Sequence, residues 1–414
     1  MDTTEKKERN IVRDLAVRVA ELVHSEENAY RQKLWLDVNN LRKPERPPVI
    51  CHPGGGAWEE LLPRKTVICK DPYMANLEYQ FRQILYKWEL GDDTVVSPWM
   101  SVPAVMRLEG QHFWGLPIRH VSVKYEDVSV TAWRYDPPIK EESDIERITP
   151  PRYHYDHAAT QENLKRMSDL LGDILPVKQT CSLPGPGAWL HGWATELRGV
   201  QQLLVDLMDR PEWVHRLMRI LMEGFMGVMD QFEDMGVLTL NNNGTMACDD
   251  LPQNDFDGKT VRICDLWGRG ESQEFHGVSP AQHEEFLLQY QKPILERFGI
   301  TYYGCCEDLT SKIPLILSIP NLRKFVCSPW TDIGKLAEAV EDRYVIEWRQ
   351  KATDVVYASD LTDVRKYLER GLRLASGCRI QIVLQELETT NHNLRRLSDW
   401  STLAKEVGAS VAGK

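Results

Sequence analysis

The sequence predicts an α/β fold, either a barrel or a doubly wound sheet. Short β-prone segments alternate with longer amphipathic ones along most of the 414 residues, which is the pattern of repeated β/α units on a parallel sheet. The strand candidates number eight, and eight strands favour a barrel. Hydrophobic residues make up 42% of the chain, enough for the core of one large barrel or of two ordinary domains.

Each predicted strand is a short run rich in β-branched or aromatic residues and lies between turn signals. They span 47–52, 92–97, 173–180, 237–242, 300–305, 324–328, 343–348 and 379–385.

The helix predicted over 211–235 carries the most signals. Pro211 suits the first turn of a helix, and apolar residues recur at helical spacing from Trp213 to Phe232. Gly236 is a helix-ending residue. Further helices are predicted over 10–41, 73–89, 159–171, 196–208, 280–298, 309–317, 333–340, 360–375 and 394–407.

Two stretches depart from a plain β/α repeat. Residues 105–135 alternate apolar and polar positions, which predicts an antiparallel β-hairpin inserted after the second unit. Residues 241–279 are rich in Asn, Asp and Gly and too long for an ordinary connection, so we expect a functional loop or lid. Without an internal repeat or a low-complexity linker, a single domain over 1–414 is expected, with an N-terminal helical segment over 1–45.

Charge and composition narrow the classes of partner. The net charge is −11 and no basic stripe offsets it, which argues against nucleic acid and anionic membrane surfaces. No apolar run approaches the roughly 20 residues of a membrane span, and the first ten residues lack a signal-peptide core. A cytoplasmic protein is therefore expected. Its nine dispersed cysteines are expected to be reduced thiols.

The run from Tyr302 to Glu307 places two thiols beside a carboxylate. Cys305, Cys306 and Glu307 are ligand types that suit a thiophilic metal, with zinc as the candidate. A structural role is equally open, because two adjacent cysteines reach one metal only with strain and buried cysteine often serves as a small apolar filler.

Thirteen tryptophans are present, and many have loop-like surroundings. Large rings next to turn residues are suited to line an aromatic substrate pocket. The alternative is that they pack between helices and loops. The predicted pocket residues are Trp99, Trp189, Trp193, Trp267 and Trp330.

Five segments together resemble the uroporphyrinogen decarboxylase superfamily, in particular its branch of corrinoid-dependent methyltransferases and O-demethylase components. The segments are NNNGTMACDDLP (241–252), DLWGRGESQEF (265–275), VSPAQHEEFLLQY (278–290), YYGCCEDL (302–309) and IPNLRKFVCSPWTD (319–332). The likeness runs from about residue 46 to 400. It implies a TIM-type (β/α)8 barrel with the reacting groups on loops at the C-terminal ends of the strands.

Two departures from that family bear on function. The decarboxylases grip a tetrapyrrole with an Arg-rich segment, whereas the loop at 51–65 is glycine-rich and acidic, which argues against uroporphyrinogen as substrate. The thiol-activating methyltransferases hold zinc with a His-x-Cys pair and a distant Cys. Here Tyr303 takes the place of the His two residues before Cys305, and Cys327 is the distant thiol.

The resemblance implies transfer of a methyl group from a small methylated compound, with methoxylated aromatics foremost, to a Co(I) corrinoid on a partner protein. Cleaving a methyl ether requires a proton or a Lewis acid at the ether oxygen. The predicted catalytic residues are Asp265, Glu274, His276, Tyr303 and Glu307.

Alternatives stay open at this point. Glu274 and His276 also suit a role in starting the helix near Ser279. A metal-assisted decarboxylase or lyase on the same barrel is the second enzyme hypothesis, and a non-catalytic corrinoid-binding barrel is a third. Whether two chains form a homodimer is not determined by the sequence.

Overall fold

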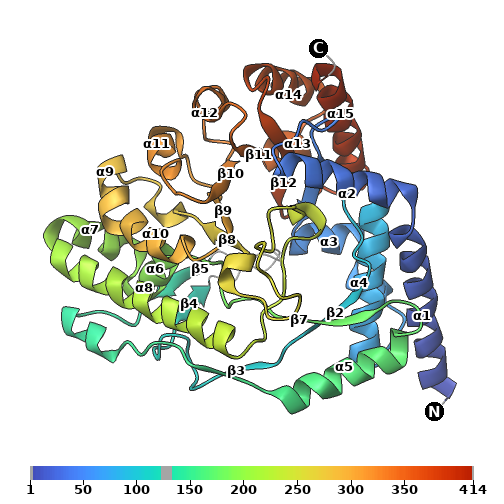
Figure 1. Cartoon of the computed structure of the whole chain (residues 1–414). Coiled ribbons are helices and arrows are strands. Elements are labelled where there is room, and N and C mark those ends of the chain that lie inside the picture. The colour runs from blue at the N-terminus through green and yellow to red at the C-terminus, as the bar shows by residue number, and fades with distance from the viewer. Residues whose placement is uncertain (1–2, 123–132, 413–414) are drawn as a thin grey trace.

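The computed structural model describes residues 3–122 and 133–412. Its centre is a curled parallel sheet of six strands in the order β1-β12-β11-β10-β9-β8 (Figure 1). Every neighbouring pair in this sheet is parallel. The strands are β1 (Val49–Pro53), β8 (Trp267–Gly270), β9 (Ile300–Tyr303), β10 (Leu322–Cys327), β11 (Val345–Gln350) and β12 (Arg379–Leu387).

Two further parallel strands, β2 (Met100–Pro103) and β7 (Val177–Thr180), pair with each other. In the described part of the chain no ladder joins this pair to the six-stranded sheet, so the eight parallel strands are compatible with a TIM-like barrel but do not close one. Irregular segments lie at both openings. Beside β1, the backbone N–H of Asp93 donates to the carbonyl of Val49 at 2.7 Å. Beside β7, the backbone N–H of Thr239 donates to the carbonyl of Cys181 at 3.1 Å.

The strand predictions fail at two places. Residues 92–97 are extended chain beside β1, and β2 begins only at Met100. Residues 237–242 form no strand, and β8 stands in their place in the order of parallel strands. Strand β8 was not predicted, because the two glycines of WGRG have a low propensity for strands. Close packing nevertheless requires both glycines. A Cβ on Gly268 would lie 2.5 Å from Phe298, and one on Gly270 would lie 2.6 Å from Tyr303.

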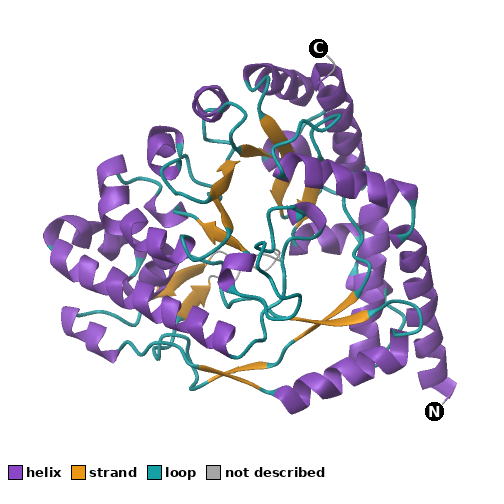
Figure 2. Ribbon diagram, viewed as in Figure 1, coloured by secondary structure: helices purple, strands orange, loops and turns teal. Residues whose placement is uncertain are grey.

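Helices surround the strands (Figure 2). The predicted helix over 211–235 is confirmed as α8 (Pro211–Asp234), with Pro211 in its first turn. The predicted helix over 10–41 is instead two helices, α1 (Thr3–Val23) and α2 (Glu26–Asn39). The break occurs because the Ser25 hydroxyl caps α2 by accepting from the backbone N–H of Asn28 at 3.2 Å.

The helix predicted over 196–208 is also two helices, which meet at Gly199. The remaining helices often follow one another without a strand between them. They are α3 (Gly55–Leu61), α4 (Pro72–Glu89), α5 (His157–Leu171), α6 (Leu190–Arg198), α7 (Val200–Asp209), α9 (Pro280–His283), α10 (Gln289–Leu295), α11 (Ile313–Ile316), α12 (Ile333–Val340), α13 (Ala352–Val356), α14 (Thr362–Leu374) and α15 (Arg396–Ala412). Among the described helices, none has the combination of length and apolar character that crossing a membrane requires.

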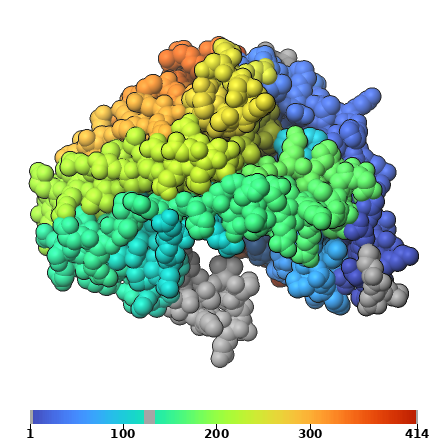
Figure 3. Space-filling model, turned by 60° about the horizontal axis from the view of Figure 1, so that its bottom comes forward, coloured from blue at the N-terminus to red at the C-terminus, as the bar shows by residue number. Residues whose placement is uncertain are grey.

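The predicted antiparallel insertion after β2 is present. Strand β4 (Arg119–Ser122) pairs antiparallel with β5 (Trp133–Asp136), and β3 (Met106–Leu108) pairs antiparallel with β6 (Tyr153–Tyr155). Residues 123–132 of the predicted hairpin lie outside the described residues. The chain that follows, from α5 to α8, forms a band of green and yellow-green across the face seen in Figure 3.

The two faces of the curled sheet have different cores. The convex face packs against the outer helices in one large apolar cluster. The concave face has a small apolar cluster, in which Trp35 and Val38 of α2 contact Ile50, Val345 and Val383 near the N-terminal ends of the strands. Helix α2 therefore covers that end of the concave face, and polar side chains occupy the other.

Candidate active site at the carboxyl ends of the strands

Strand alternation turns five charged side chains toward the concave face, and we call them the concave-face cluster. They are Arg269 on β8, Glu271 just after it, Lys324 on β10, and Glu347 and Arg349 on β11. Arg349 Nε donates to Glu347 Oε1 at 3.0 Å, and Arg269 Nη2 donates to Glu271 Oε2 at 2.6 Å. Lys324 Nζ lies 3.9 Å from Glu347 Oε2. Three cationic side chains thus gather around two carboxylates on this face.

Burial makes these charges sensitive to their neighbours. The Arg349 side chain is 7% exposed and the Lys324 side chain 2%. Burial lowers the pKa of the Lys324 ammonium. Burial also opposes ionisation of Glu347, but Arg349 and Lys324 outweigh it and hold the pKa of that carboxyl below its ordinary value. A cavity of about 50 Å³, lined by Lys324, Glu347 and His52 among others, adjoins the cluster.

The turn after β9 places two thiols beside this cluster. The Sγ atoms of Cys305 and Cys306 are 3.3 Å apart, and Arg349 Nη1 lies 3.7 Å from Cys305 Sγ. Cys306 Sγ also donates to a carboxylate oxygen of Glu386, the last residue but one of β12, which has a left-handed conformation with φ of 62°. The hydrogen bond with Cys306 lowers the pKa of Cys305, and Arg349 acts in the same direction. The pKa of Cys306 is raised by Cys305, by burial and by Glu386.

Two residues fix the conformation of this turn. Gly304 has φ of 115°, and a Cβ there would meet the carbonyl oxygen of Val326 at 2.9 Å, so glycine is required. Glu307 is 2% exposed. One carboxylate oxygen accepts from the backbone N–H of Ser272 at 2.7 Å and from its hydroxyl at 3.0 Å, and the other accepts from the N–H of Cys305 at 2.9 Å. The carboxylate of Glu307 therefore ties the turn to the loop after β8.

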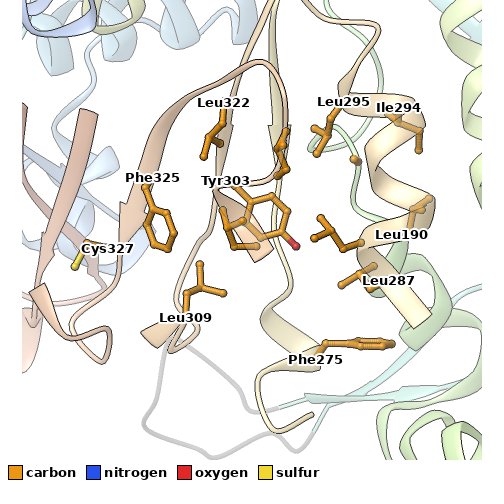
Figure 4. Packing of buried hydrophobic residues seen from close by; sticks show 14 of the residues in the cluster. Leu190, Phe275, Leu287, Ile294, Leu295, Tyr303, Leu309, Leu322, Phe325 and Cys327 are labelled. Carbon is orange, nitrogen blue, oxygen red and sulfur yellow. The ribbon is translucent and has the colours of Figure 1, made fainter. Parts of the chain in front are cut away.

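Tyr303, a predicted proton donor, lies on the opposite face of the sheet. Its ring is fully buried among apolar side chains of the outer layer (Figure 4). Its hydroxyl donates to Gln291 Oε1 at 2.8 Å and lies 3.0 Å from His283 Nε2. Burial raises the pKa of the phenol well above its ordinary value. Because side chains alternate along a strand, Tyr302 faces the concave-face cluster and Tyr303 faces away from it.

Asp265 and His276, two further predicted catalytic residues, hold loops in place. Asp265 is fully buried and accepts from the backbone N–H groups of Gln253 at 2.9 Å and Arg262 at 3.0 Å. Nδ1 of His276 accepts from the backbone N–H of Asp308 at 3.4 Å. Neither residue contacts the concave-face cluster in the described hydrogen bonds and ion pairs.

Glu274 belongs to a separate buried group near α6. Its Oε2 atom lies 2.8 Å from Nε2 of His191, which is fully buried. The nearby Glu196 carboxyl has its pKa raised to about 7 by burial and by the charge of Glu274. This acid group is a second place where a proton is held near neutral pH. The helix-start alternative is not supported for Glu274, since Ser279 and Gln282 form the capping box of α9 themselves.

The predicted aromatic pocket is assembled only in part. Trp267 lies beneath the concave-face cluster, with Lys324 Nζ 5.6 Å from its ring centroid. The ring of Tyr302 is 5.9 Å from the same ammonium, and the indole N–H of Trp267 donates to the carbonyl of Met246 at 2.9 Å. These two rings form one wall of the charged region.

The other four tryptophans lie apart from that wall. Trp189 and Trp193 pack edge to face, 6.2 Å between centroids, and Trp193 is buried. Trp99 stacks under the ammonium of Lys178 at 4.1 Å. Trp330, which follows β10, is 58% exposed. Packing between elements thus accounts for Trp189, Trp193 and Trp99, and Trp330 remains as a surface ring.

Of the predicted zinc ligands, Cys305 and Cys306 lie side by side, but the Glu307 carboxylate is directed to the backbone and hydroxyl of Ser272 and to the backbone of Cys305. Within residues 3–122 and 133–412, no three His, Cys, Asp or Glu side chains are arranged to hold a metal ion. Both oxygens of Glu307 accept hydrogen bonds, and Cys327 is fully buried with its Sγ 3.6 Å from the carbonyl oxygen of Thr331. The Arg349 guanidinium beside Cys305 would also repel a cation. These residues do not fit the predicted zinc site, and metal analysis of the pure protein is the direct test of that prediction.

Comparison with known proteins adds a fold relationship. No protein-family model matches the sequence, and neither does any curated protein. Among solved structures, a methyltransferase from Methanosarcina mazei is similar with a TM-score of 0.50 and 11% sequence identity, over 91% of this chain and 98% of that chain. At this identity the likeness concerns the fold alone. It is compatible with the TIM-type barrel fold that the sequence motifs imply.

Proposed function

We propose that this protein is a methyltransferase that moves a methyl group from a small methylated compound to a Co(I) corrinoid carried by a separate protein. Among methylated compounds, methoxylated aromatic compounds are the first candidates for the methyl donor. The observation that carries the proposal is the gathering of three cationic side chains, Arg269, Lys324 and Arg349, on the concave face, which leads to the carboxyl ends of the strands where enzymes of this fold type perform their chemistry. The similarity to the methyltransferase from Methanosarcina mazei supports it.

The cluster suits the difficult part of ether demethylation. An aryl methyl ether is inert because the phenolate that leaves is a poor leaving group. Donors already aimed at the developing negative charge lower this barrier, and removing one typically costs about 10²-fold to 10³-fold in rate. The guanidinium groups of Arg269 and Arg349 are held in place by Glu271 and Glu347, so they need no reorganisation when the charge appears.

In this proposal, cations rather than proton donors provide most of the stabilisation of the leaving oxygen. The polar atoms of Asp265, Tyr303 and Glu307 are already engaged in hydrogen bonds within the fold. Glu274 remains as the predicted acid without such an engagement, apart from its contact with His191. The leaving oxygen is therefore stabilised first by charge, and its protonation follows from solvent or from a neighbouring acid.

A corrinoid, when bound, supplies the cobalt nucleophile that accepts the methyl group. The residues of this chain bind and orient the methyl donor beneath it. A partner protein that brings the corrinoid would approach the carboxyl ends of the strands. Two large rings are exposed there, Trp330 after β10 at 58% and Tyr357 after β11 at 61%, and exposed aromatic rings are common in protein interfaces.

The experiment mixes pure protein, a reduced corrinoid protein and a panel of methoxyarenes and methylamines, and follows the absorbance of methyl-Co(III). Methylation with at least one class of donor is expected, with methoxyarenes foremost. Absence of methylation with every class contradicts the proposal. Release of carbon dioxide without corrinoid would favour the decarboxylase or lyase hypothesis, and corrinoid binding without turnover would favour the non-catalytic barrel.

A further inference from the structure

The thiol pair of Cys305 and Cys306 has a chemistry of its own. We propose that these two cysteines form a hydroperoxide-reactive site that closes to a disulfide between neighbouring residues. The proposal rests on the placement of the two sulfur atoms and their partners, and it holds whether or not the protein transfers methyl groups.

The turn brings together two side chains that an extended strand would separate. Neighbouring residues of a strand point to opposite faces, but the left-handed Gly304 and the hydrogen bonds of Glu307 bend the chain so that the two Sγ atoms lie 3.3 Å apart. Both cysteines are partly exposed. No other sulfur pair in the described chain is in hydrogen-bond contact, and all nine cysteines are free.

The surroundings give the two thiols different roles. Arg349 lies 3.7 Å from Cys305 Sγ and favours its thiolate, which is the nucleophilic form. Cys306 Sγ directs its hydrogen toward Cys305 or toward the carboxylate of Glu386. Cys305 is therefore the attacking sulfur and Cys306 the resolving one, with Glu386 placed to take the resolving proton.

The reaction runs in two balanced steps. The Cys305 thiolate attacks the terminal oxygen of a hydroperoxide; the S–O bond forms, the O–O bond breaks, and the departing oxygen takes a proton from solvent to become water or an alcohol. The Cys305 sulfur is oxidised to a sulfenic acid and the peroxide is reduced. Cys306 gives its proton to Glu386 and its sulfur then attacks Cys305 sulfur; the S–S bond forms, the S–O bond breaks, and the departing hydroxide takes the proton from Glu386 to leave as water.

The product is expected to be easily reduced. Neighbouring Cα atoms are about 3.8 Å apart across a trans peptide, whereas ordinary disulfides join Cα atoms roughly 4.4–6.8 Å apart. A disulfide at this turn is therefore strained, and strained disulfides have the higher reduction potentials of labile sites. Oxidation also withdraws the thiolate from Arg349 and the thiol from Glu386, so it changes the concave-face cluster.

The test treats the full-length protein with one equivalent of hydrogen peroxide and maps its peptides by mass. The peptide holding both cysteines should lose two hydrogen atoms and regain them with dithiothreitol. Cys306→Ser should stop at a sulfenic acid on Cys305, which dimedone traps. Cys305→Ser and Cys305→Ala should both leave Cys306 unreacted, and a thermal melt checks that each variant is folded.

Two matched variants separate the site from general thiol reactivity. Cys327→Ser should react like the wild type, because Cys327 is fully buried and away from the pair. Arg349→Met should slow the loss of the Cys305 thiol by about tenfold, with Arg349→Lys restoring most of the rate, since a nearby cation favours the thiolate. The proposal is overturned if the pair stays reduced while other cysteines oxidise, or if dimedone labels Cys306 instead of Cys305. None of these readouts depends on methyl transfer.

Discussion

The neighbouring strands β9 and β10 both lead into cysteine, and the two ends differ in almost every physical respect. Cys305 and Cys306 lie in a turn beyond β9, partly exposed and beside Arg349. Cys327 is the last residue of β10 and is fully buried in the apolar layer under the outer helices, where burial raises the pKa of its thiol. The comparison shows that the position at a strand end decides whether a thiol lies partly exposed beside a cation or is sealed in the core.

Tyr302 and Tyr303, on strand β9, show a similar dependence, here on the face of the sheet. They are adjacent in sequence, yet Tyr302 lies in the charged concave region and Tyr303 is sealed between the sheet and the outer helices. A motif that contains both, such as YYGCCE, therefore mixes residues of a candidate site with residues of the core.

The largest expected difference is in thiol alkylation. In native protein, iodoacetamide should label Cys305 at least about 10³-fold faster than Cys327, because the thiolate is the reactive form and Cys327 is both buried and held as the thiol. Quantitative peptide mapping over a time course measures both rates in one sample. Equal rates under native conditions would contradict the expected difference between Cys305 and Cys327. Equal rates in denaturant are the expected control.

Glu307→Gln should lower the free energy of unfolding by about 2 kcal/mol, because the amide group presents N–H donors where two backbone N–H groups and a hydroxyl now donate. Urea denaturation gives the value. Glu338→Gln, at an exposed position of α12, is the matched control and should change stability by less than about 0.5 kcal/mol. Full stability with lost turnover in Glu307→Gln would instead restore the catalytic role that the sequence predicts.

Tyr303→Phe should cost about 1–1.5 kcal/mol of stability, since it removes the hydroxyl that donates to Gln291 and lies beside His283. Turnover should change by less than about twofold, because the ring lies on the face away from the cluster. Tyr344→Phe, just before β11 and away from the carboxyl ends of the strands, controls for the substitution itself. A large fall in turnover at unchanged stability would contradict this placement of Tyr303.

A pH-dependent effect on stability is expected at Glu196. Its carboxyl has a pKa of about 7 in the folded protein and an ordinary value of 4.5. Between these values the folded state holds a proton that the unfolded state has released, so the contribution to stability is full below pH 4.5 and falls as pH rises to 7. Glu196→Gln should abolish this fall and be about 1–2 kcal/mol more stable above pH 7, after allowance for partial solvent access. Parallel denaturation curves from pH 5 to 8 test it, and identical pH profiles would contradict it.

Much of the fold was readable from periodicity and turn residues. Helix α8 matched because Pro211, the apolar spacing and Gly236 agree, and most strands matched because β-branched runs lie between turn signals. The misplaced strand at 237–242 shows the limit. Its residues are β-prone, yet only one backbone bond, from Thr239 to Cys181, is described there, and the side chains of Thr239 and Asn241 make the other bonds to the neighbouring chain in place of a ladder.

Only part of the site was predicted from the sequence. The charged cluster was missed, although the strand sequences themselves contain a signal for it. Strands of a parallel sheet covered on both faces are expected to be apolar throughout. The segment RYVIEWRQ instead carries Glu347 and Arg349 at alternate positions, and Arg269 and Glu271 repeat that spacing in WGRGE. Charges two residues apart in such a strand indicate one polar face. The pairing between strands could not be derived this way, because it depends on the order and register of β8, β10 and β11.

The most direct test of the central claim compares Arg349→Met with Arg343→Met in the methyl-Co(III) assay, using the best donor of the panel. Arg349 belongs to the concave-face cluster, whereas Arg343 lies just before β11 with a 59% exposed side chain. The cluster account predicts a loss of about 10²-fold or more in kcat/KM for Arg349→Met and little change for Arg343→Met. Equal activity of both folded variants would contradict the claim that charge at the carboxyl ends of these strands drives the reaction.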